Sequence, residues 1–593
     1  MAKTSDFIVE RLSLWGVKRV FGYPGDSINP LITAIGRDES IEFIQARHEE
    51  MCAFMACAHA KFTGELGVCI ATSGPGAIHL LNGLYDAKLD HQPVLAIVGQ
   101  QPRHAIGSSF LQDVDLAALF KDVAHQYVHT AMAPEQVRHL IDRSIRTAYA
   151  ERCVACLVLP HDVLNEKAEA EPKREHGQSF SGIGYTPPNF VPSNEDLIRA
   201  AEVLNEGSKV AILVGAGALN ARDEIVAIAD ILGAGVAKAL LGKAALEDDL
   251  LFVTGSIGML GTDASWEMMN ECDTLLVVGS NFPYAEFLPK PGSARGVQID
   301  IDPKNLSLRY PMEIALQGDS VATLRALAPL LKSKEDRSWR LKIQQSVMRS
   351  KETLAAQANV EGAPVNPQSV FNRLSDVLPD EAIITADSGT STVWFARHLQ
   401  IRRGMMASVS GGLASMGCSI PYAIAAKFAH PHRPVIACSG DGAMQMMGNN
   451  ELITVAKYWR EWIDPRFIVI VLKNNDLNFV TWEMRSMEGD PMYEASQALP
   501  DFEYADYARS LGLQGFLITN ASETEEVLRE AMLCERPVLV EVISDPNIPP
   551  LPPNIDIKKA ASFASSLTKA EPEGSKPFWG AMSQIWQKIF HRH

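Results

Sequence analysis

Short apolar runs of strand length recur along the chain and alternate with longer segments of helical periodicity. Four of these runs are "VLAIVG" (94–99), "VAILVGAG" (210–217), "TLLVVGS" (274–280) and "FIVIVL" (467–472). A strand that is apolar along its whole length is covered on both faces, and strands that alternate with helices form parallel sheets. The chain is therefore predicted to be an α/β protein built from doubly wound parallel sheets.

Two polar segments divide this pattern into three parts. Residues 165–196 are predicted to be a linker, and residues 332–368 a second linker with helical character. The predicted domains are residues 1–165, 195–335 and 365–545, followed by a tail at 546–593. A chain of 593 residues, 47% of them apolar, is long enough to bury one core in each domain.

The composition disfavours several functional classes. Asp and Glu outnumber Lys and Arg by 71 to 54, and the net charge of -17 disfavours nucleic acid as a partner. The N-terminal residues lack the apolar core of a secretory signal, and no apolar run approaches the ~18 residues that span a membrane. Nine cysteines in a chain of this length are typical of reduced thiols, so the cytoplasm is the expected location. The CxxC of Cys153 and Cys156 lies in an apolar run, which favours buried packing over zinc or redox chemistry.

The stretch "SGDGAM" (439–444) carries an acidic residue between two glycines at a strand-to-helix turn. Glycines let backbone N–H groups approach an anion, and a helix N-terminus favours negative charge. Asp441 could then hold a hard cation such as Mg²⁺, which commonly shares its oxygen ligands between a carboxylate and a phosphate. An Asn pair, Asn474 and Asn475, follows the next apolar strand and makes this interpretation more specific than a lone turn motif.

These motifs resemble those of the thiamine-diphosphate-dependent 2-oxo-acid enzymes, and the resemblance covers nearly the whole chain. Within that superfamily the order of motifs is similar to the pyruvate oxidase and quinone-dependent pyruvate dehydrogenase branch. The segments that carry the resemblance are "GVKRVFGYPGDSIN", "RHEEMCAFMA", "SGPGAIHLLNGLYDA", "GSNFPYAEF", "VQIDIDP", "DSGTSTVW" and "SGDGAM".

The resemblance implies the ligands of a magnesium ion that bridges to the cofactor's diphosphate. They are Asp441, Asn474 and the backbone carbonyl of Asp476, with Asn475 as the alternative to Asn474. The family has an Asn where this chain has Lys473, and the segment before it is several residues longer than usual, around "REWIDP".

Other residues are assigned to the cofactor by the same resemblance. Glu49 matches the acid that activates the aminopyrimidine, whereas Glu50 matches a variable position; a solvated helix face is the alternative interpretation of this pair. Met416 matches the apolar residue that supports the bent cofactor, although a core methionine has the same pattern. The remaining cofactor residues are Pro24, Gly25, Ser73, Gly74, Asn82, Gly389, Thr390, Ser391, Gly440, Gly442 and Ala443.

The residues near the expected substrate position distinguish the branches. Simple decarboxylases carry a His pair where this chain has Gln112 and Asp113, and acetohydroxyacid synthases carry a Trp where it has Glu483. Glu483 and His79 both match the oxidase branch, although a packed helix histidine is an alternative for His79. Leu111 departs from the aromatic residue of that branch. The predicted catalytic residues are Glu49, His79, Gln112 and Glu483.

An oxidase of this branch needs FAD, and glycines and acidic residues at strand ends of the middle domain are typical of dinucleotide sites. The predicted FAD residues are Gly215, Gly255, Gly279, Ser280, Asn281, Asp300, Asp302 and Asp319.

The resemblance thus implies oxidative decarboxylation of pyruvate or a close 2-oxo acid through a thiamine-diphosphate enamine, with electrons passing to FAD and then to a quinone or O₂. An acetolactate-synthase-like carboligase of the same fold is the alternative, and a non-catalytic scaffold is a more remote one. A homo-oligomer, dimer or tetramer, is expected because in the family the cofactor lies between the first domain of one subunit and the third domain of another.

The tail contains one amphipathic pattern. A helix over 577–592 would place two tryptophans, Trp579 and Trp586, on one apolar stripe with basic residues toward its end. Such a helix suits a membrane interface, although docking on the protein's own core is an equal alternative on pattern alone. The quinone-dependent branch has a C-terminal lipid-binding segment, so peripheral contact with a membrane surface is expected.

Overall fold

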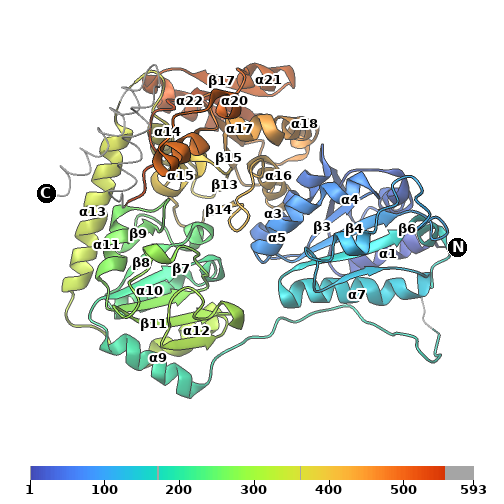
Figure 1. The fold of residues 1–593 in the computed structure, drawn as a ribbon, viewed down its shortest axis with the longest axis horizontal. Helices are drawn as coiled ribbons and strands as arrows, with labels where there is room; N and C mark the ends of the chain where they lie inside the picture. The colour runs from blue at the N-terminus through green and yellow to red at the C-terminus, as the bar shows by residue number, and fades with distance from the viewer. Residues whose placement is uncertain (1, 170–172, 361, 554–593) are drawn as a thin grey trace. The chain divides into compact units, whose positions relative to one another are not determined.

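The computed structural model describes residues 2–169, 173–360 and 362–553, and these contain three six-stranded sheets (Figure 1). The strand pairs run parallel, as in the ladder of β4 (Val94–Gln100) with β6 (Val154–Pro160). The α/β architecture with three doubly wound parallel sheets is therefore confirmed. The described chain forms two compact units: the first comprises Met1–Pro187, Val409–Val435 and Ala443–Phe467, and the second comprises the remainder.

The first sheet has the order β2-β1-β3-β4-β6-β5. One face is covered by α1, α2, α7 and α8, which share a core with the strands, and α3 contacts β1 and β3. The elements are β1 (Arg19–Gly22), β2 (Glu42–Gln45), β3 (Gly67–Ala71), β4, β5 (Val128–Thr130), β6, α1 (Thr4–Leu14), α2 (Asn29–Arg37), α3 (Glu49–Thr63), α4 (Pro75–His79), α5 (Leu81–Leu89), α6 (Leu116–Leu119), α7 (Pro134–Glu151) and α8 (His161–Asn165).

Helix α3 shows why the local sequence positions the first part of the site. Almost every residue from Met51 to Phe62 is buried, because α3 lies against α5, α16 and the strands β1 and β3. The helix begins directly after His48 and ends at Gly64, whose φ of 72° is the left-handed conformation typical of a helix C-terminus. Burial on all sides fixes the start of α3, where Glu49 lies.

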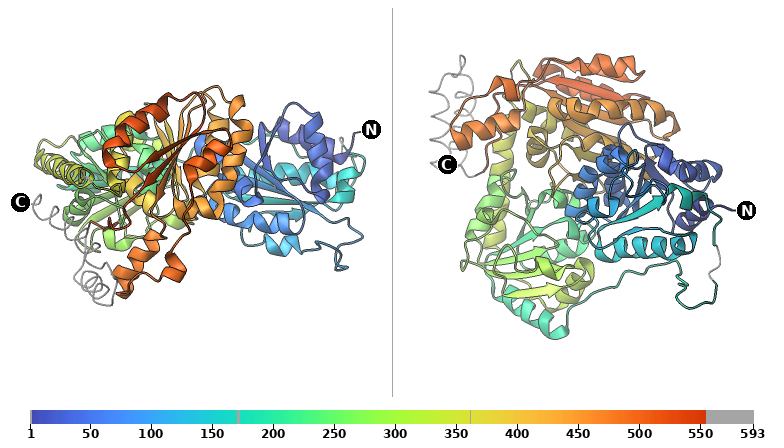
Figure 2. Two further views of the ribbon diagram at one scale, coloured as in Figure 1. Left: turned by 90° about the horizontal axis from the view of Figure 1, so that it is seen from above. Right: turned by 45° about the vertical axis from the view of Figure 1, so that its right-hand side comes forward.

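The second sheet has the order β12-β11-β10-β7-β8-β9 and belongs to the second unit. Helices α9, α10 and α12 share one core with it, and α11 and α13 share a second core on its other face (Figure 2). The elements are β7 (Val210–Val214), β8 (Gly235–Lys238), β9 (Val253–Ser256), β10 (Thr274–Val278), β11 (Arg295–Asp300), β12 (Ile314–Gln317), α9 (Asn194–Glu206), α10 (Arg222–Ile231), α11 (Asp263–Glu271), α12 (Ser320–Leu327) and α13 (Ser338–Ala358).

The third sheet has the order β14-β13-β15-β16-β18-β17. Helices α16 and α18 belong to the first compact unit, whereas α14, α15 and α19 to α22 belong to the second. The elements are β13 (Ile383–Ala386), β14 (Met406–Val409), β15 (Val435–Gly440), β16 (Phe467–Lys473), β17 (Gln514–Ile518), β18 (Val538–Ile543), α14 (Pro367–Val377), α15 (Thr390–His398), α16 (Ser419–Ala429), α17 (Asp441–Ala443), α18 (Asn449–Tyr458), α19 (Asn478–Glu483), α20 (Glu494–Gln497), α21 (Tyr504–Ser510) and α22 (Thr524–Leu533).

The structure can be compared with the segment predictions. The four apolar runs form β4, β7, β10 and β16, although β7 ends at Val214 because Ala216–Ala218 turns into a 3₁₀ helix. Cys153 and Cys156 are buried, as predicted. Helix α13 occupies the second polar segment. No helix within 2–169, 173–360 and 362–553 is long and apolar enough to span a membrane. The predicted helix 577–592 lies outside the described residues.

His398, at the end of α15, is a buried histidine whose contribution to stability depends on pH. Both of its ring nitrogens lack a hydrogen-bond partner among the described residues. Burial, with further contributions from Arg397 and Lys243, lowers its pKa to about 3. The unfolded chain gains a proton near pH 6.5 and the folded protein does not, so this residue makes stability fall as the pH drops from about 6.5 toward 3.

Replacing the His398 imidazole should remove this loss of folding stability at low pH. Between pH 8 and pH 5 the group costs about 2 kcal/mol of folding free energy. We expect His398→Leu to unfold at a higher denaturant concentration than the parent at pH 5, with a smaller difference at pH 8. The residue His432 provides the control, because it lies at the surface and His432→Leu should leave the pH dependence unchanged. Equal pH dependence in His398→Leu and the parent would contradict the assignment.

Candidate active site

Asp441 is a buried carboxylate that forms no ion pair among the residues the structure describes. It lies at the end of β15, is 3% exposed, and accepts backbone N–H groups of Asn474 (2.8 Å) and Asn475 (2.6 Å) on Oδ2 and of Gly442 (2.9 Å) on Oδ1. Burial raises its pKa to about 6. No lysine or arginine of the described chain forms an ion pair with it. A desolvated carboxylate that lacks a counter-charge fits a hard cation such as Mg²⁺.

The turn after β16 brings the predicted ligands beside Asp441. Asn475 has a φ of 55°, and its Oδ1 is buried without a hydrogen-bond partner among the described residues. Asn474 Oδ1 accepts the N–H of Asp476 (3.1 Å). The Asp476 carboxylate accepts hydrogen bonds from Thr481 (2.5 Å) and Asn478 (2.9 Å). This side chain thus holds the turn, which is compatible with the prediction that only the Asp476 carbonyl binds metal.

Lys473, where the family pattern has an Asn, is held by two carboxylates. Its Nζ forms ion pairs with Glu541 of β18 (3.0 Å) and with Asp501 (2.6 Å). The carbonyl of Asn475 accepts the N–H of Leu499 (2.9 Å). Lys473 therefore anchors the base of the Asn turn to the sheet and to the segment that follows it.

Glu49 and two histidines form the second group of predicted residues. Glu49 is 9% exposed, and its Oε2 lies 2.9 Å from Nδ1 of the exposed His79. His48 caps α3 by accepting the N–H of Glu50 (3.2 Å), and its ring lies 4.4 Å from that of His79. Burial and the neighbouring His79 lower the pKa of His48, which favours its neutral form. Ligand atoms of His48, Glu49 and His79 all lie within 4.8 Å of one another.

Gly76 is a residue of this group that sequence reasoning missed. A Cβ atom on Gly76 would lie 3.3 Å from Glu49 Oε1 and 2.8 Å from Thr72 Cγ2. A side chain there would press on the carboxylate. The signal in the sequence was the second glycine of "SGPGA", which follows a glycine that was already assigned to the cofactor.

Three further predicted residues meet in the first unit. Ser73 Oγ donates to Gln112 Oε1 (3.2 Å), and a Cβ atom on Gly74 would lie 2.7 Å from Gln112 Cβ. Asn82 donates to Glu50 (2.6 Å) and to Ser415 (2.9 Å). The structure therefore places Gln112 directly over the Gly-rich turn that precedes α4.

Trp482 and Glu483 are adjacent at the end of α19, and they differ in burial. Trp482 is buried, and its indole N–H donates to the carbonyl of Pro546 (3.1 Å). Glu483 is exposed at the end of the same helix. The two adjacent side chains therefore face different ways on the helix, and the tryptophan is fixed in the protein interior.

In the middle sheet the predicted glycines pack against each other. A Cβ atom on Gly215 would lie 2.4 Å from the Gly279 carbonyl, and Gly279 itself has a φ of 57°. Asp302 and Asp319 accept backbone N–H groups as helix caps, and Asp300 accepts the N–H of Asp302 (2.9 Å). The loops at the carboxyl ends of β7 and β10 are thus held close together, where parallel sheets bind nucleotides.

The other predicted residues lie on Gly-rich turns or beside them. Gly25 contacts Thr72, because a Cβ atom there would lie 2.4 Å from Thr72 Cβ, and Gly389 has a φ of 113° and open space around it. The residues of the first unit are Pro24, Gly25, Glu49, Ser73, Gly74, His79, Asn82, Gln112, Met416 and Ala443. Those of the second unit are Gly215, Gly255, Gly279, Ser280, Asn281, Asp300, Asp302, Asp319, Gly389, Thr390, Ser391, Gly440, Asp441, Gly442, Asn474, Asp476 and Glu483.

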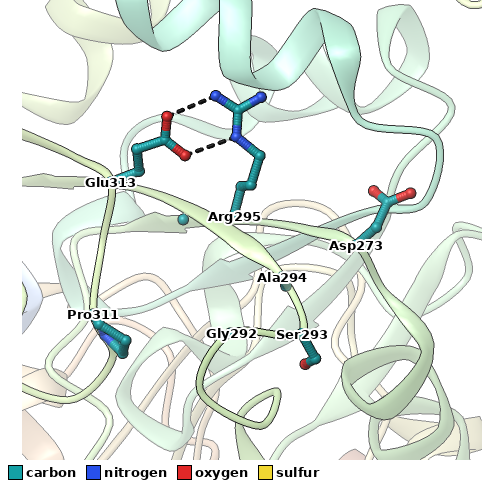
Figure 3. Close-up of a pocket in the computed structure, with 8 residues that line it drawn as sticks. Asp273, Gly292, Ser293, Ala294, Arg295, Pro311 and Glu313 are labelled. Carbon is teal, nitrogen blue, oxygen red and sulfur yellow. Dashed lines mark hydrogen bonds and ion pairs between the residues drawn. The ribbon is translucent and has the colours of Figure 1, made fainter.

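The second unit has a pocket at the amino ends of strands of the middle sheet, away from the predicted nucleotide residues (Figure 3). It includes Asp273 and Arg295, which mark the amino ends of β10 and β11, and Arg295 is paired with Glu313 at 2.6 Å. Ligands of open parallel sheets bind at the carboxyl ends of the strands. The pocket is therefore not the predicted nucleotide site.

Three family models match the chain, one in each sheet region. They describe the N-terminal TPP binding domain (residues 2–119), the central domain (197–327) and the C-terminal TPP binding domain (387–542) of thiamine pyrophosphate enzymes. A Bacillus subtilis (strain 168) protein, YdaP, whose description names thiamine pyrophosphate, is 36% identical over 586 residues, 98% of each chain. The chain belongs to the thiamine pyrophosphate enzyme family.

Relatives with two different reactions are about equally similar to this thiamine pyrophosphate enzyme. A pyruvate oxidase of Lactiplantibacillus plantarum is 29% identical over 564 residues, 94% of this chain and 91% of the relative. The acetolactate synthase isozyme 2 large subunit of Escherichia coli (strain K12) is 30% identical over 566 residues, 93% of this chain and 97% of the relative. Similarity to these relatives establishes the family and does not distinguish the two reactions.

The contact between Gly74 and Gln112 gives a test of the Gly-rich turn that precedes α4. Gly74 has a φ of 60° and lacks room for a Cβ atom. We expect Gly74→Ala to cost about 1–3 kcal/mol of stability and to expose residues 107–113 to hydrogen exchange. Gly36 in α2 is the control, because nothing lies within 4 Å of the point that an added Cβ atom would occupy and an alanine fits the helix. Exchange in 107–113 that matches the parent's would contradict the contact.

Proposed function

We propose that this enzyme oxidatively decarboxylates pyruvate or a close 2-oxo acid with thiamine diphosphate, Mg²⁺ and FAD, and passes the electrons to a quinone or O₂. The observation that carries the proposal is the pair of buried carboxylates, Glu49 and Asp441, each on a turn of the family's two TPP binding domains. The pyruvate oxidase relative supports the choice of reaction.

Asp441 and the Asn turn are the proposed magnesium and diphosphate site. The ligands would be Asp441, Asn474 and the carbonyl of Asp476, with Asn475 as the alternative because its Oδ1 is buried and unpartnered among the described residues. Gly440 and Gly389 have open space beside their Cα atoms, which lets phosphate oxygens approach the backbone. The donors fit a hard cation with a phosphate partner.

Glu49 is the proposed activating acid. Thiamine diphosphate, when bound, supplies a carbon nucleophile and an electron sink for the decarboxylation. Glu49 would hold a proton against the pyrimidine ring, and His79 at 2.9 Å would orient the carboxyl through Nδ1. Gln112 accepts from Ser73 through Oε1 and lies over Gly74, so its side-chain N–H would be placed to donate to a substrate carboxylate or carbonyl.

Two features support an oxidative reaction: the residues at the end of α19 and the loops at the carboxyl ends of the middle sheet's strands. Glu483 is exposed while Trp482 is buried and bonded to Pro546, so no tryptophan is presented at the position that shapes a pocket for a second oxo acid. The closely packed loops at Gly215 and Gly279, with Asp300 at the next strand end, support an FAD site.

Carboligation of the acetolactate synthase type is the second candidate. It is supported by the Escherichia coli relative, which is as similar to this chain as the pyruvate oxidase. Leu111, which is 72% exposed, also departs from the aromatic residue that the oxidase branch carries there.

We further propose a homo-oligomer in which two chains complete each cofactor site, and contact of the segment 577–592 with a membrane surface. Both follow from the family resemblance, and the second also from the amphipathic pattern of a segment outside the described residues.

One experiment separates the two reactions. The purified enzyme is examined by visible absorption, and pyruvate-dependent reduction of ferricyanide or a quinone analogue is followed with and without thiamine diphosphate. A flavin spectrum that pyruvate bleaches only with thiamine diphosphate supports oxidation. Acetolactate formation without acceptor reduction would favour the second candidate.

The role of Glu49 predicts a specific kinetic result. We expect Glu49→Gln to lose nearly all turnover while the affinity for thiamine diphosphate stays within about tenfold, because the carboxyl acts on the ring proton and not on the diphosphate. Turnover and cofactor titrations on the same preparation provide the measurement. The neighbour Glu50 is the control, and parental activity in Glu49→Gln would rule out the assignment.

The metal site predicts a different result. Asp441→Ala should raise the Mg²⁺ concentration needed for half-maximal activity, and excess Mg²⁺ with cofactor should restore part of the turnover. Asn474→Ala and Asn475→Ala are compared in the same titration. The larger shift is expected in Asn474→Ala; a larger shift in Asn475→Ala would move the proposed ligand by one residue.

A further inference from the structure

Glu451 is a fully buried carboxylate that the proposed chemistry does not use. It lies in the first turn of α18, is 0% exposed, and accepts the backbone N–H of Arg47 through Oε1 at 2.9 Å. The Thr454 hydroxyl, one helical turn further along α18, also acts on this carboxylate and lowers its pKa. Burial raises its pKa to about 7. Burying an ionisable side chain in the protein interior costs folding free energy, which a purely apolar side chain would not.

The contact lies at the edge of the first sheet. Strand β2 is the outer strand of that sheet and pairs with β1 on one side only, so the N–H groups of its other edge need partners. The N–H of Gln45, the last residue of β2, donates to the phenol oxygen of Tyr458 (2.9 Å), and the N–H of Arg47 donates to Glu451.

Helix α18 supplies both partners from one face. Glu451 and Tyr458 are seven residues apart, which is two helical turns, and both are buried. Gln45 and Arg47 are two residues apart, so their N–H groups point the same way along an extended chain. The helix therefore fixes the backbone at the end of β2 at two successive outward positions.

This backbone leads straight into the start of α3. Arg47 is followed by His48, which caps α3, and then by Glu49, whose carboxyl meets His79. Glu451 also lies close enough to Cys52, in the first turn of α3, for its charge to raise the pKa of that thiol in addition to the effect of burial. The charged side chain that acts on Glu451 itself is Arg47.

We infer that Glu451 is a positioning residue for Glu49: by holding the Arg47 N–H it fixes the turn that aims the Glu49 carboxyl. This inference rests on the proposed role of Glu49. The sequence contains one hint, since Glu451, Leu452, Val455 and Tyr458 recur at the spacing of an apolar helix face, where a glutamate is unexpected.

The test compares three full-length variants. Glu451→Gln keeps an oxygen acceptor of nearly the same shape, Glu451→Ala removes it, and Tyr458→Phe removes only the acceptor for Gln45. We expect Glu451→Ala to lower kcat by about 100-fold with KM nearly unchanged, because small misplacements of a catalytic group have effects of that size. Glu451→Gln and Tyr458→Phe should stay within about tenfold of the parent.

Hydrogen exchange of the cofactor-free protein gives a readout that does not depend on turnover. The Arg47 amide should exchange at least about tenfold faster in Glu451→Ala than in the parent, and Glu451→Gln should keep its protection. If Glu451→Ala does not fold, the same comparison is made with Glu451→Leu, which fills much of the space without an acceptor. Parental kcat together with a protected Arg47 amide in these acceptor-free variants would overturn the inference.

A double variant separates this inference from the proposed function. In a Glu49→Gln background, Glu451→Ala should produce no further loss of the residual turnover, because both changes act on one group. If Glu49→Gln is fully active, the proposed function fails, whereas the exchange result at Arg47 still reports the contact. If Glu49→Gln is inactive and Glu451→Ala is active, only the positioning role fails.

Discussion

The buried Asp441 carboxylate joins the turn after β15 to the turn after β16. Its two oxygens accept three backbone N–H groups, and two of these come from Asn474 and Asn475. The same carboxylate lacks a cation among the described residues, and burial raises its pKa to about 6. A structural role alone would be served by a neutral acceptor at lower cost. We therefore propose that a bound metal ion supplies the missing positive charge at this site.

A similar arrangement surrounds Glu49. Its turn is fixed by His48 at the start of α3 and by Glu451 behind the Arg47 backbone, and Gly76 leaves room beside the carboxyl. Lys473 does for the Asn turn what Glu451 does for the Glu49 turn, since it ties the turn's base to Glu541. In both places a charged residue outside the proposed chemistry holds the backbone that carries it.

The sequence predicted the architecture because the apolar runs that form β4, β7, β10 and β16 are covered on both faces and alternate with helices, as is typical of a layered α/β fold. It also placed Asp441 and the Asn pair at neighbouring strand ends. It did not predict Glu451, because that residue's partner lies about 400 positions away in the chain and the contact is made through a backbone N–H. The role of Lys473 could not be predicted either, because Asp501 and Glu541 are distant in sequence and contact it only in the folded protein.

The most direct test is the position of a metal ion. A crystal of the enzyme grown with Mn²⁺ in place of Mg²⁺ and with thiamine diphosphate would show the ion by anomalous scattering. We predict a peak at about 2.0–2.3 Å from an Asp441 carboxylate oxygen, bridging to the diphosphate. A peak on the His48, Glu49 and His79 cluster, whose ligand atoms lie within 4.8 Å of one another, with none at Asp441, would contradict the account.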